Sequence, residues 1–447
     1  MKSKIYIMFL IALFGSCNEN DLDKYPLNQI SNETFWNTEN DLKIYNNTFY
    51  DYAKNSTMRL LQGNLGGVGI EGQYGLDGMT DNVLRDLSYA QYLPKIRAGQ
   101  ITPDDNPAPF GWNNSTFAFI RAINIGLANY DAADITQSTI DKYKAEARLF
   151  RAWVVADKVS LYGDFPWVEK ELNIDSPELY SERTPRETVM EKVFEDLDFA
   201  CNNLPDDWGD GKAPGRLNRW AALLIKSRIC LFEGTWRKYH GGNEPEFWLQ
   251  EAAKASLELI ESGPYELYST GNPEHDYNSI FQMSDLTGVQ EVLWWRRYEP
   301  GVIVNSWQWY LRLIHPTKSM VEDYLCKDGL PISLSPLYKG DSFYTNIFEN
   351  RDPRLRQTIL HPDDLKYYDY SNGSISRVPM LESNNEWASL TGYHPIKFVN
   401  VNQMVLMHEG YYPSIVLRYA EALLNFAEAK AELGNITQSD LDISINL

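Results

Sequence analysis

The sequence predicts a mainly α-helical protein, in which a scaffold of paired helices carries a loop-rich region with short strands. Helical apolar periodicity recurs in several segments between residues 117 and 260 and again near the end of the chain. Residues 265–413 are instead rich in Pro, Gly, Asn and aromatic residues, with only short periodic runs. Such composition is typical of structured loops, which often carry binding function. The chain of 447 residues is long enough for one large domain or two to three ordinary ones.

The N-terminus begins with a short apolar run. Lys2 and Lys4 precede residues 5–14, a run too short to cross a hydrocarbon core of roughly 30 Å. Residues 1–16 are therefore predicted to be a signal peptide. The run leads into Phe14-Gly15-Ser16-Cys17, which is similar to a bacterial lipoprotein box, so Cys17 is the predicted lipidation site. Acyl chains there would anchor the protein to a membrane; the alternative is an ordinary cleaved signal in which Cys17 has no role.

The predicted helices follow in chain order, and their ends are marked by capping and stop residues. Thr184-Pro185 with Glu187 predicts a capped start with proline at the first helical position. Gly163 and Gly234 are each predicted to stop the helix that precedes them. Gly263-Pro264 and Gly434 are predicted to stop two later helices in the same way. The predicted helices span residues 117–130, 142–162, 185–201, 218–232, 247–260 and 414–433, with another beginning near Gln438.

Small residues recur where these helices would touch. Ala420, Ala427 and Ala431 fall on one side of the last long helix, near Leu417 and Leu424. Alanine-rich contact lines let antiparallel helices approach closely, as in tetratricopeptide hairpins. A strict period of about 34 residues is missing, so we expect an irregular helical array.

Charge and cysteine content restrict the function. The net charge of −20 argues against nucleic acid, whose phosphates need a basic surface, and against adhesion to anionic lipid through a basic patch. Cys201, Cys230 and Cys326 are odd in number and match no metal-ligand spacing, so they are predicted to be buried free thiols.

Catalytic and cofactor motifs fail when their context is considered. Residues 67–72 fit GxGxxG, but polar loop residues flank them where a strand and a helix are required. His408-Glu409 begins an HExxH-like pattern, but Tyr412 stands at the second ligand position. No GxSxG is present, and spacing singles out no carboxylate pair among the 61 acidic residues. We therefore expect no enzyme, no metal and no cofactor.

Five segments carry a resemblance to a known family. They are residues 23–36 with a Thr-Phe-Trp element, EARLFRA at 146–152 followed by YGDFP at 162–166, LFEGTWRKYH at 231–240, RDPRL at 351–355 and LRYAEALL at 417–424. In this order, behind a lipoprotein box, they resemble the SusD/RagB family of Bacteroidota surface lipoproteins. Each segment also has a structural interpretation: Asp352-Pro353 suits a helix start, and Arg351 and Arg354 are expected to pair with carboxylates. We expect the signatures to mark the scaffold and not the ligand site.

The resemblance implies a SusD-like fold with an N-terminal region at 17–235 and a C-terminal region at 236–447. It also implies a truncated C-terminal end, because family members continue past the helix near Gln438 whereas this chain ends at Leu447. The implied function is noncatalytic capture of oligosaccharides at the cell surface, with lipid anchoring in the outer membrane. The implied partner is a SusC-like TonB-dependent transporter of a polysaccharide-utilization system, which imports the captured glycan.

The ligand contacts are predicted from aromatic residues in variable loops, because a pyranose packs its C–H face on a flat ring. In the segment VIVNSWQWYLR at 302–312, strand alternation puts Trp307 and Trp309 on one face and Gln308 and Tyr310 on the other. The sequence does not choose which face is core. Tyr74 and Trp112 lie in glycine- and proline-rich loops, although Trp112 could instead pack over a helix that starts near Asn113. Candidate hydroxyl partners are Asn113, Asn305 and Gln308.

Two alternatives remain open. A RagB-like protein would capture peptides or glycopeptides for the same kind of transporter on an identical scaffold. A glycosidase is the third hypothesis, and it would have to release reducing ends from an oligosaccharide.

Overall fold

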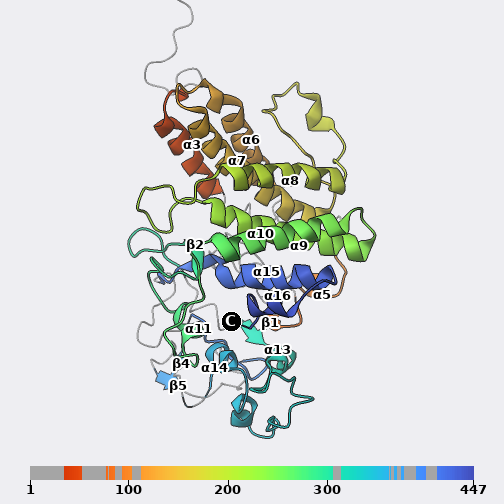
Figure 1. Ribbon diagram of the computed structural model, residues 1–447, viewed down its shortest axis with the longest axis vertical. Helices are drawn as coiled ribbons and strands as arrows, with labels where there is room; N and C mark the ends of the chain where they lie inside the picture. Colours follow the sequence, from red (N-terminus) through yellow and green to blue (C-terminus); the bar gives the residue numbers. More distant parts are fainter. Residues whose placement is uncertain are drawn as a thin grey trace, which may run out of the picture.

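Two kinds of structure make up the described part of the chain: long stacked helices and a set of short elements joined by loops (Figure 1). The computed structural model describes residues 35–52, 77–78, 80–85, 93–102, 112–305, 314–361, 363, 367–369, 374–376, 389–398 and 410–446. In Figure 1 the long helices lie in successive layers in the upper and middle parts of the molecule. Most of the short elements lie in the lower part. The mainly helical prediction is confirmed.

The long helices pack as antiparallel neighbours. Helix α7 packs against α8, α9 against α10, and α15 covers α10 and α9 (Figure 1). None of the helices among the described residues has the length and apolar character needed to cross a membrane. The bounds are α3 Glu39–Tyr52, α6 Asn114–Asn129, α7 Gln137–Tyr162, α8 Arg186–Asn203, α9 Arg219–His240, α10 Pro245–Ser262, α15 Tyr419–Glu432 and α16 Gln438–Asp442.

The short elements include three antiparallel strand pairs. Their bounds are β1 Val83–Arg85 with β3 Ile314–Pro316, β2 Val292–Arg296 with β6 Ser414–Arg418, and β4 Tyr367–Asp369 with β5 Ser374–Ser376. Pairing of β2 with β6 joins the loop-rich region to the start of α15. The short helices are α5 Leu93–Arg97, α11 Asp276–Ser279, α13 Lys318–Asp323 and α14 Pro353–Thr358, and the 3-10 segments are η7 Tyr130–Ala132, η8 Pro177–Tyr180 and η10 Tyr344–Phe348.

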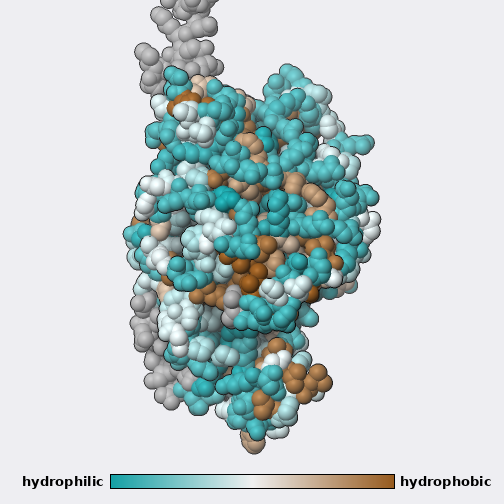
Figure 2. Space-filling model, viewed as in Figure 1, coloured by the Kyte–Doolittle hydropathy of each residue, from teal (hydrophilic) through white to brown (hydrophobic). Residues whose placement is uncertain are grey.

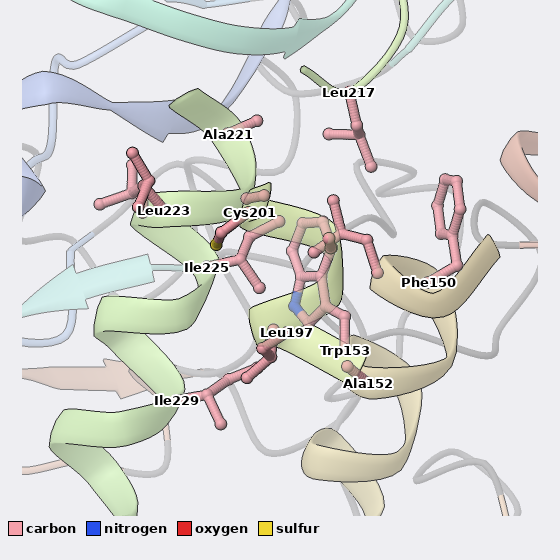
Figure 3. Packing of buried hydrophobic residues seen from close by; sticks show 14 of the residues in the cluster. Phe150, Ala152, Trp153, Leu197, Cys201, Leu217, Ala221, Leu223, Ile225 and Ile229 are labelled. Carbon is pink, nitrogen blue, oxygen red and sulfur yellow. The ribbon is translucent and has the colours of Figure 1, made fainter. Parts of the chain in front are cut away.

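The main core includes residues of α3, α6, α7, α8, α9, α10 and α15, and part of it lies between α7, α8 and α9. Trp153 of α7 is 3% exposed and stands at the centre of this packing, with Leu197, Cys201 and Ile225 around it (Figure 3). Burying a large aromatic ring contributes about 1.5–3 kcal/mol relative to leaving it exposed. Cys201, Cys230 and Cys326 are free and buried, as expected from the sequence.

One predicted helix stop is wrong, and glycine geometry explains why. Gly163 does end α7, with φ +70°. Gly234, however, lies inside α9, which continues to His240 and ends at Gly241 in the left-handed region. A Cβ on Gly234 would lie 2.8 Å from Cγ of Leu249 on α10. Gly234 therefore permits close approach of α9 and α10. In the sequence, a glycine at a helix contact cannot be told from a glycine that stops a helix.

The starts of α15 and α8 also differ from prediction. Ser414–Arg418 is strand β6, because its residues pair with β2 and do not begin the helix. At α8, Pro185 is the N-cap residue and its side chain makes no capping bond. The cap comes from Asp164 after α7, whose Oδ1 accepts a hydrogen bond of 2.8 Å from Arg186 N. Long-range partners determined both starts.

The face shown in Figure 2 is mainly hydrophilic, in keeping with the net charge of −20. On the face shown, an apolar area lies over α15 and α16. Leu424 of α15 and Ile445 after α16 are 57% and 49% exposed.

Candidate functional site

The family-like segment EARLFRA forms buried polar contacts within the helical scaffold. Glu146 is fully buried and accepts hydrogen bonds from Asn46 Nδ2 at 2.9 Å and Tyr50 Oη at 2.5 Å, and it pairs with Arg216. Arg151 forms a two-bond pair with Asp196, at 2.7 and 2.9 Å. These charge-assisted bonds join α3, α7, α8 and the loop before α9.

The segment LFEGTWRKYH lies in α9 and likewise forms buried polar contacts with neighbouring parts of the scaffold. Glu233 is fully buried and accepts from Arg186 Nη1 at 2.7 Å and Arg237 Nε at 2.6 Å. The Arg186 guanidinium lies 3.6 Å from the Trp236 ring centroid, and His240 stacks on the same ring. The indole is thus held between two side chains of the scaffold.

The segments RDPRL and LRYAEALL also have structural roles. Asp352 caps α14 with Pro353 at the first position, and Arg354 binds Asp352, as predicted. The expectation for Arg351 is wrong: it donates to backbone carbonyls, because burial at 2% exposure puts it among loop backbone and not beside a carboxylate. In the second segment, Arg418 pairs with Glu291 and Glu421 with Arg228.

The ends of the aromatic segment at 302–312 are fixed by backbone pairing. Asn305 is 2% exposed; its backbone exchanges hydrogen bonds with Gly410, and its side-chain amide donates to Tyr412 O at 2.8 Å. A Cβ on Gly410 would lie 2.5 Å from Asn305 Oδ1, so this bridge needs glycine. After the segment, β3 pairs with β1 in the register Arg85↔Ile314. The chain that follows the Tyr74 loop is therefore paired with the chain that follows Tyr310.

Trp112 and Asn113 stand at the start of α6. Asn113 is the N-cap, and its Oδ1 accepts from Thr116 N at 3.1 Å. Trp112 is half-buried and meets Tyr162 and Phe165 edge-on, with ring centroids 5.0 and 5.3 Å apart. The Arg183 guanidinium lies 4.6 Å from its ring centroid. These contacts explain the positions of Trp112 and Asn113 in the fold, and their ligand contact stays a prediction.

The remaining predicted site residues lie outside the described residues. They are Cys17, Tyr74, Trp307, Gln308, Trp309 and Tyr310. The glycine-rich run at 67–72 and the pair His408-Glu409 fall in the same category.

The sequence did not reveal a pocket of about 780 Å³ between α11, η10 and α14. Its lining comes from residues between 274 and 396, which no periodic pattern connects. One sequence feature does coincide with the pocket: its lining includes Arg351, Asp352 and Pro353 of the RDPRL segment. Burial opposes ionisation of Asp352, but its hydrogen bonds from Arg354 hold the pKa of this carboxyl below its usual value.

A stack of helical hairpins that carries a loop-rich half with short strand pairs defines a SusD-like class of fold. A family model described as "Starch-binding associating with outer membrane" matches residues 35–231, and the "SusD family" model matches residues 272–447. The two models follow each other along the chain. This chain belongs to the SusD/RagB family.

Curated relatives agree with this assignment. SusD-like protein P25 of Formosa agariphila is 25% identical over 289 residues, which cover 62% of this chain and 49% of that protein. A SusD-like protein of Bacteroides ovatus is 22% identical over 78% of this chain and 62% of its own length. The chain thus spans about half to three fifths of these two relatives. SusD-like protein P2 of Formosa agariphila is 22% identical over 99% of this chain and 85% of its own.

Solved structures share the fold. A SusD-like protein from Bacteroides fragilis matches with a TM-score of 0.69 at 22% identity, over 95% of this chain and 80% of that one. A SusD-like carbohydrate binding protein from the same species matches with a TM-score of 0.70 at 22% identity, over 92% and 78%.

Proposed function

We propose that this chain is a noncatalytic, surface-exposed lipoprotein that captures oligosaccharides and delivers them to a SusC-like TonB-dependent transporter. The observation that carries the proposal is the ordered match of two SusD-type family models to residues 35–231 and 272–447. Two structural neighbours are named for carbohydrate binding and for laminarin binding, and one family model is described as starch-binding.

Capture would rely on stacking and hydrogen bonding. Trp307 and Trp309, or Tyr310 on the other strand face, would present a ring to the C–H face of a pyranose. Pairing of β1 with β3 supports a shared site, because it brings the chain segments after Tyr74 and after Tyr310 together. Gln308 and other polar side chains would bind the hydroxyls. Lipid on Cys17 would anchor the protein in the outer membrane.

A polysaccharide array tests the proposal. The purified wild type is expected to bind at least one glycan, and Trp309→Ala is expected to weaken that binding at least tenfold, because each lost 1.4 kcal/mol is about tenfold in affinity. Phe343→Ala is a matched control, since this ring is 70% exposed and lies on a different segment. Unchanged binding by Trp309→Ala would remove this residue from the site. Peptide binding without glycan binding would contradict glycan capture itself.

Catalysis is tested on the same samples. Each bound oligosaccharide should be recovered intact, with no new reducing ends. Released reducing ends would contradict the noncatalytic assignment.

A further inference from the structure

The pocket is lined by α11, η10, α14 and the loops that flank them. Helices α11 and α14 lie among the short elements of the loop-rich half (Figure 1). The pocket volume of about 780 Å³ is within the range of ligand pockets, roughly 300–1,000 Å³. His275, Asn278 and Gln282 line the side formed by α11 and its flanks, and Phe348 lines the side formed by η10.

One wall of the pocket is held by Gln357, which is 3% exposed. Its Oε1 accepts from Asn278 N at 3.0 Å, and its Nε2 donates to Pro273 O at 2.7 Å. Asn278 Nδ2 returns a bond of 2.8 Å to Gln357 O. Helices α11 and α14 are thus cross-linked directly, so this wall is formed before any ligand arrives.

A second part of the lining is held by Arg351. Its guanidinium donates to the carbonyls of Val321 at 2.8 Å, Tyr324 at 2.6 Å and Ile347 at 3.2 Å. These bonds fix the end of α13 and the 3-10 turn η10 against the start of α14. A preformed pocket loses less conformational entropy on binding, which favours affinity.

The lining combines one phenyl ring with planar polar groups. Phe348 is half-buried, and its orientation is set by edge contacts with Tyr344 at 5.5 Å and His361 at 5.0 Å. The amides of Asn278 and Gln282, which are hydrogen-bonded to each other, and the exposed ring of His275 line the same pocket. An apolar face surrounded by groups that donate and accept hydrogen bonds matches a sugar ring with its hydroxyls.

The charge of the lining restricts the ligand further. Four carboxylates, of Glu274, Glu349, Asp352 and Asp363, face three basic side chains, of Lys327, Arg351 and Arg356. Arg351 is already engaged by carbonyls, and Asp352 is bound by Arg354. With no surplus of positive charge, the pocket offers little attraction to a sulfated or uronic sugar. It fits a neutral polyol.

We propose that this pocket is a second saccharide-binding site, which takes a neutral oligosaccharide with one sugar ring on Phe348 and its hydroxyls on the α11 side. The site is separate from the aromatic segment at 302–312, and it rests on the proposed function in glycan capture. Two sites on one protein would raise the avidity for a polymer without any new contact.

Isothermal titration of the full chain with maltoheptaose and laminarihexaose tests the proposal, with an oligogalacturonate as the anionic probe. The wild type is expected to show two sites for one of the neutral probes and neither site for the oligogalacturonate. Phe348→Ala is expected to weaken one of them at least tenfold. His275→Ala is the second variant. Its ring is exposed, so its removal leaves the contacts of Phe348 with Tyr344 and His361 in place. Phe343→Ala, on the same chain segment but outside the pocket, should leave both sites unchanged.

The outcomes separate this site from the first one. If Trp309→Ala removes all binding, or if Phe348→Ala and His275→Ala both bind as the wild type does, the second site is refuted while glycan capture stands. Tight binding of the oligogalacturonate at this pocket would refute the neutral-ligand assignment. If the wild type binds no glycan on the array and neither neutral probe in the titration, both proposals fail.

Discussion

The helical half and the loop-rich half use buried polar side chains in different ways. In the helical half, carboxylates such as Glu146, Asp196 and Glu233 are matched by arginine side chains from neighbouring helices. In the loop-rich half, Arg351 and Gln357 instead hold the backbone of irregular segments. Buried carboxylates of the helices thus bind arginine side chains of the scaffold itself. Arg351 and Gln357 instead hold the loops that line the pocket proposed to bind a saccharide.

The largest expected effect is loss of a buried charge partner in the helical half. Glu146→Ala would leave Arg216 buried at 8% exposure without its carboxylate and the Tyr50 hydroxyl without its acceptor, while Asn46 Nδ2 would keep only the carbonyl of Tyr143. Breaking a buried ion pair costs about 3–5 kcal/mol. Urea denaturation should therefore show a lower free energy of unfolding by about that amount. The control Glu195→Gln removes an exposed pair with Lys192 and should change nothing measurable; a similar loss there would contradict the distinction between buried and surface charge.

The next effect concerns pH and lies in the loop-rich half. Burial, and then the nearby His315, lower the pKa of His394 from 6.5 to about 4. Between these two values the unfolded chain binds the proton and the folded chain does not, so stability rises with pH across this window and is lost as pH falls from 6.5 towards 4. The contribution is up to about 3 kcal/mol.

Urea denaturation at pH 7, 5.5 and 4.5 measures this effect. His394→Gln should flatten the dependence of the unfolding free energy on pH relative to the wild type. An equal slope in both proteins would show that His394 does not carry it.

Helix contact in the scaffold gives the third prediction. Alanine normally improves a helix over glycine by about 1 kcal/mol, but a Cβ on Gly234 would meet Leu249 at 2.8 Å and its backbone N at 3.0 Å. Gly234→Ala is therefore expected to destabilise the fold by about 1–3 kcal/mol. In a double-mutant cycle with Leu249→Ala, the paired loss should be smaller than the sum of the single losses. Additive losses would contradict direct contact.

These cases show how much the sequence could predict. Apolar periodicity was sufficient for α6, α7 and α10, because local spacing determines which helix face is buried. It failed where a distant partner decides the structure: Ser414–Arg418 is a strand because β2 lies beside it, and Asp164 replaces Thr184 as a cap. Gly234 was misread because a helix stop and a close contact both require glycine.

The candidate sites also divide into features that the sequence indicates and features that only tertiary packing creates. The family signatures were expected to mark scaffold, and the buried pairs of Glu146 and Glu233 and the partly buried pair of Glu421 agree. The pocket at α11 and α14 could not be foreseen, because His275, Phe348 and Gln357 meet only through tertiary packing. The aromatic segment at 302–312 stays a prediction from composition.

Hydrogen exchange with bound glycan tests the difference between the two halves most directly. A neutral oligosaccharide that binds on the array should slow amide exchange in peptides covering residues 302–316, 274–282 and 345–361, and leave α7, α8 and α9 unchanged. Glycan-dependent protection confined to those three helices would contradict the division into a helical scaffold and a binding half.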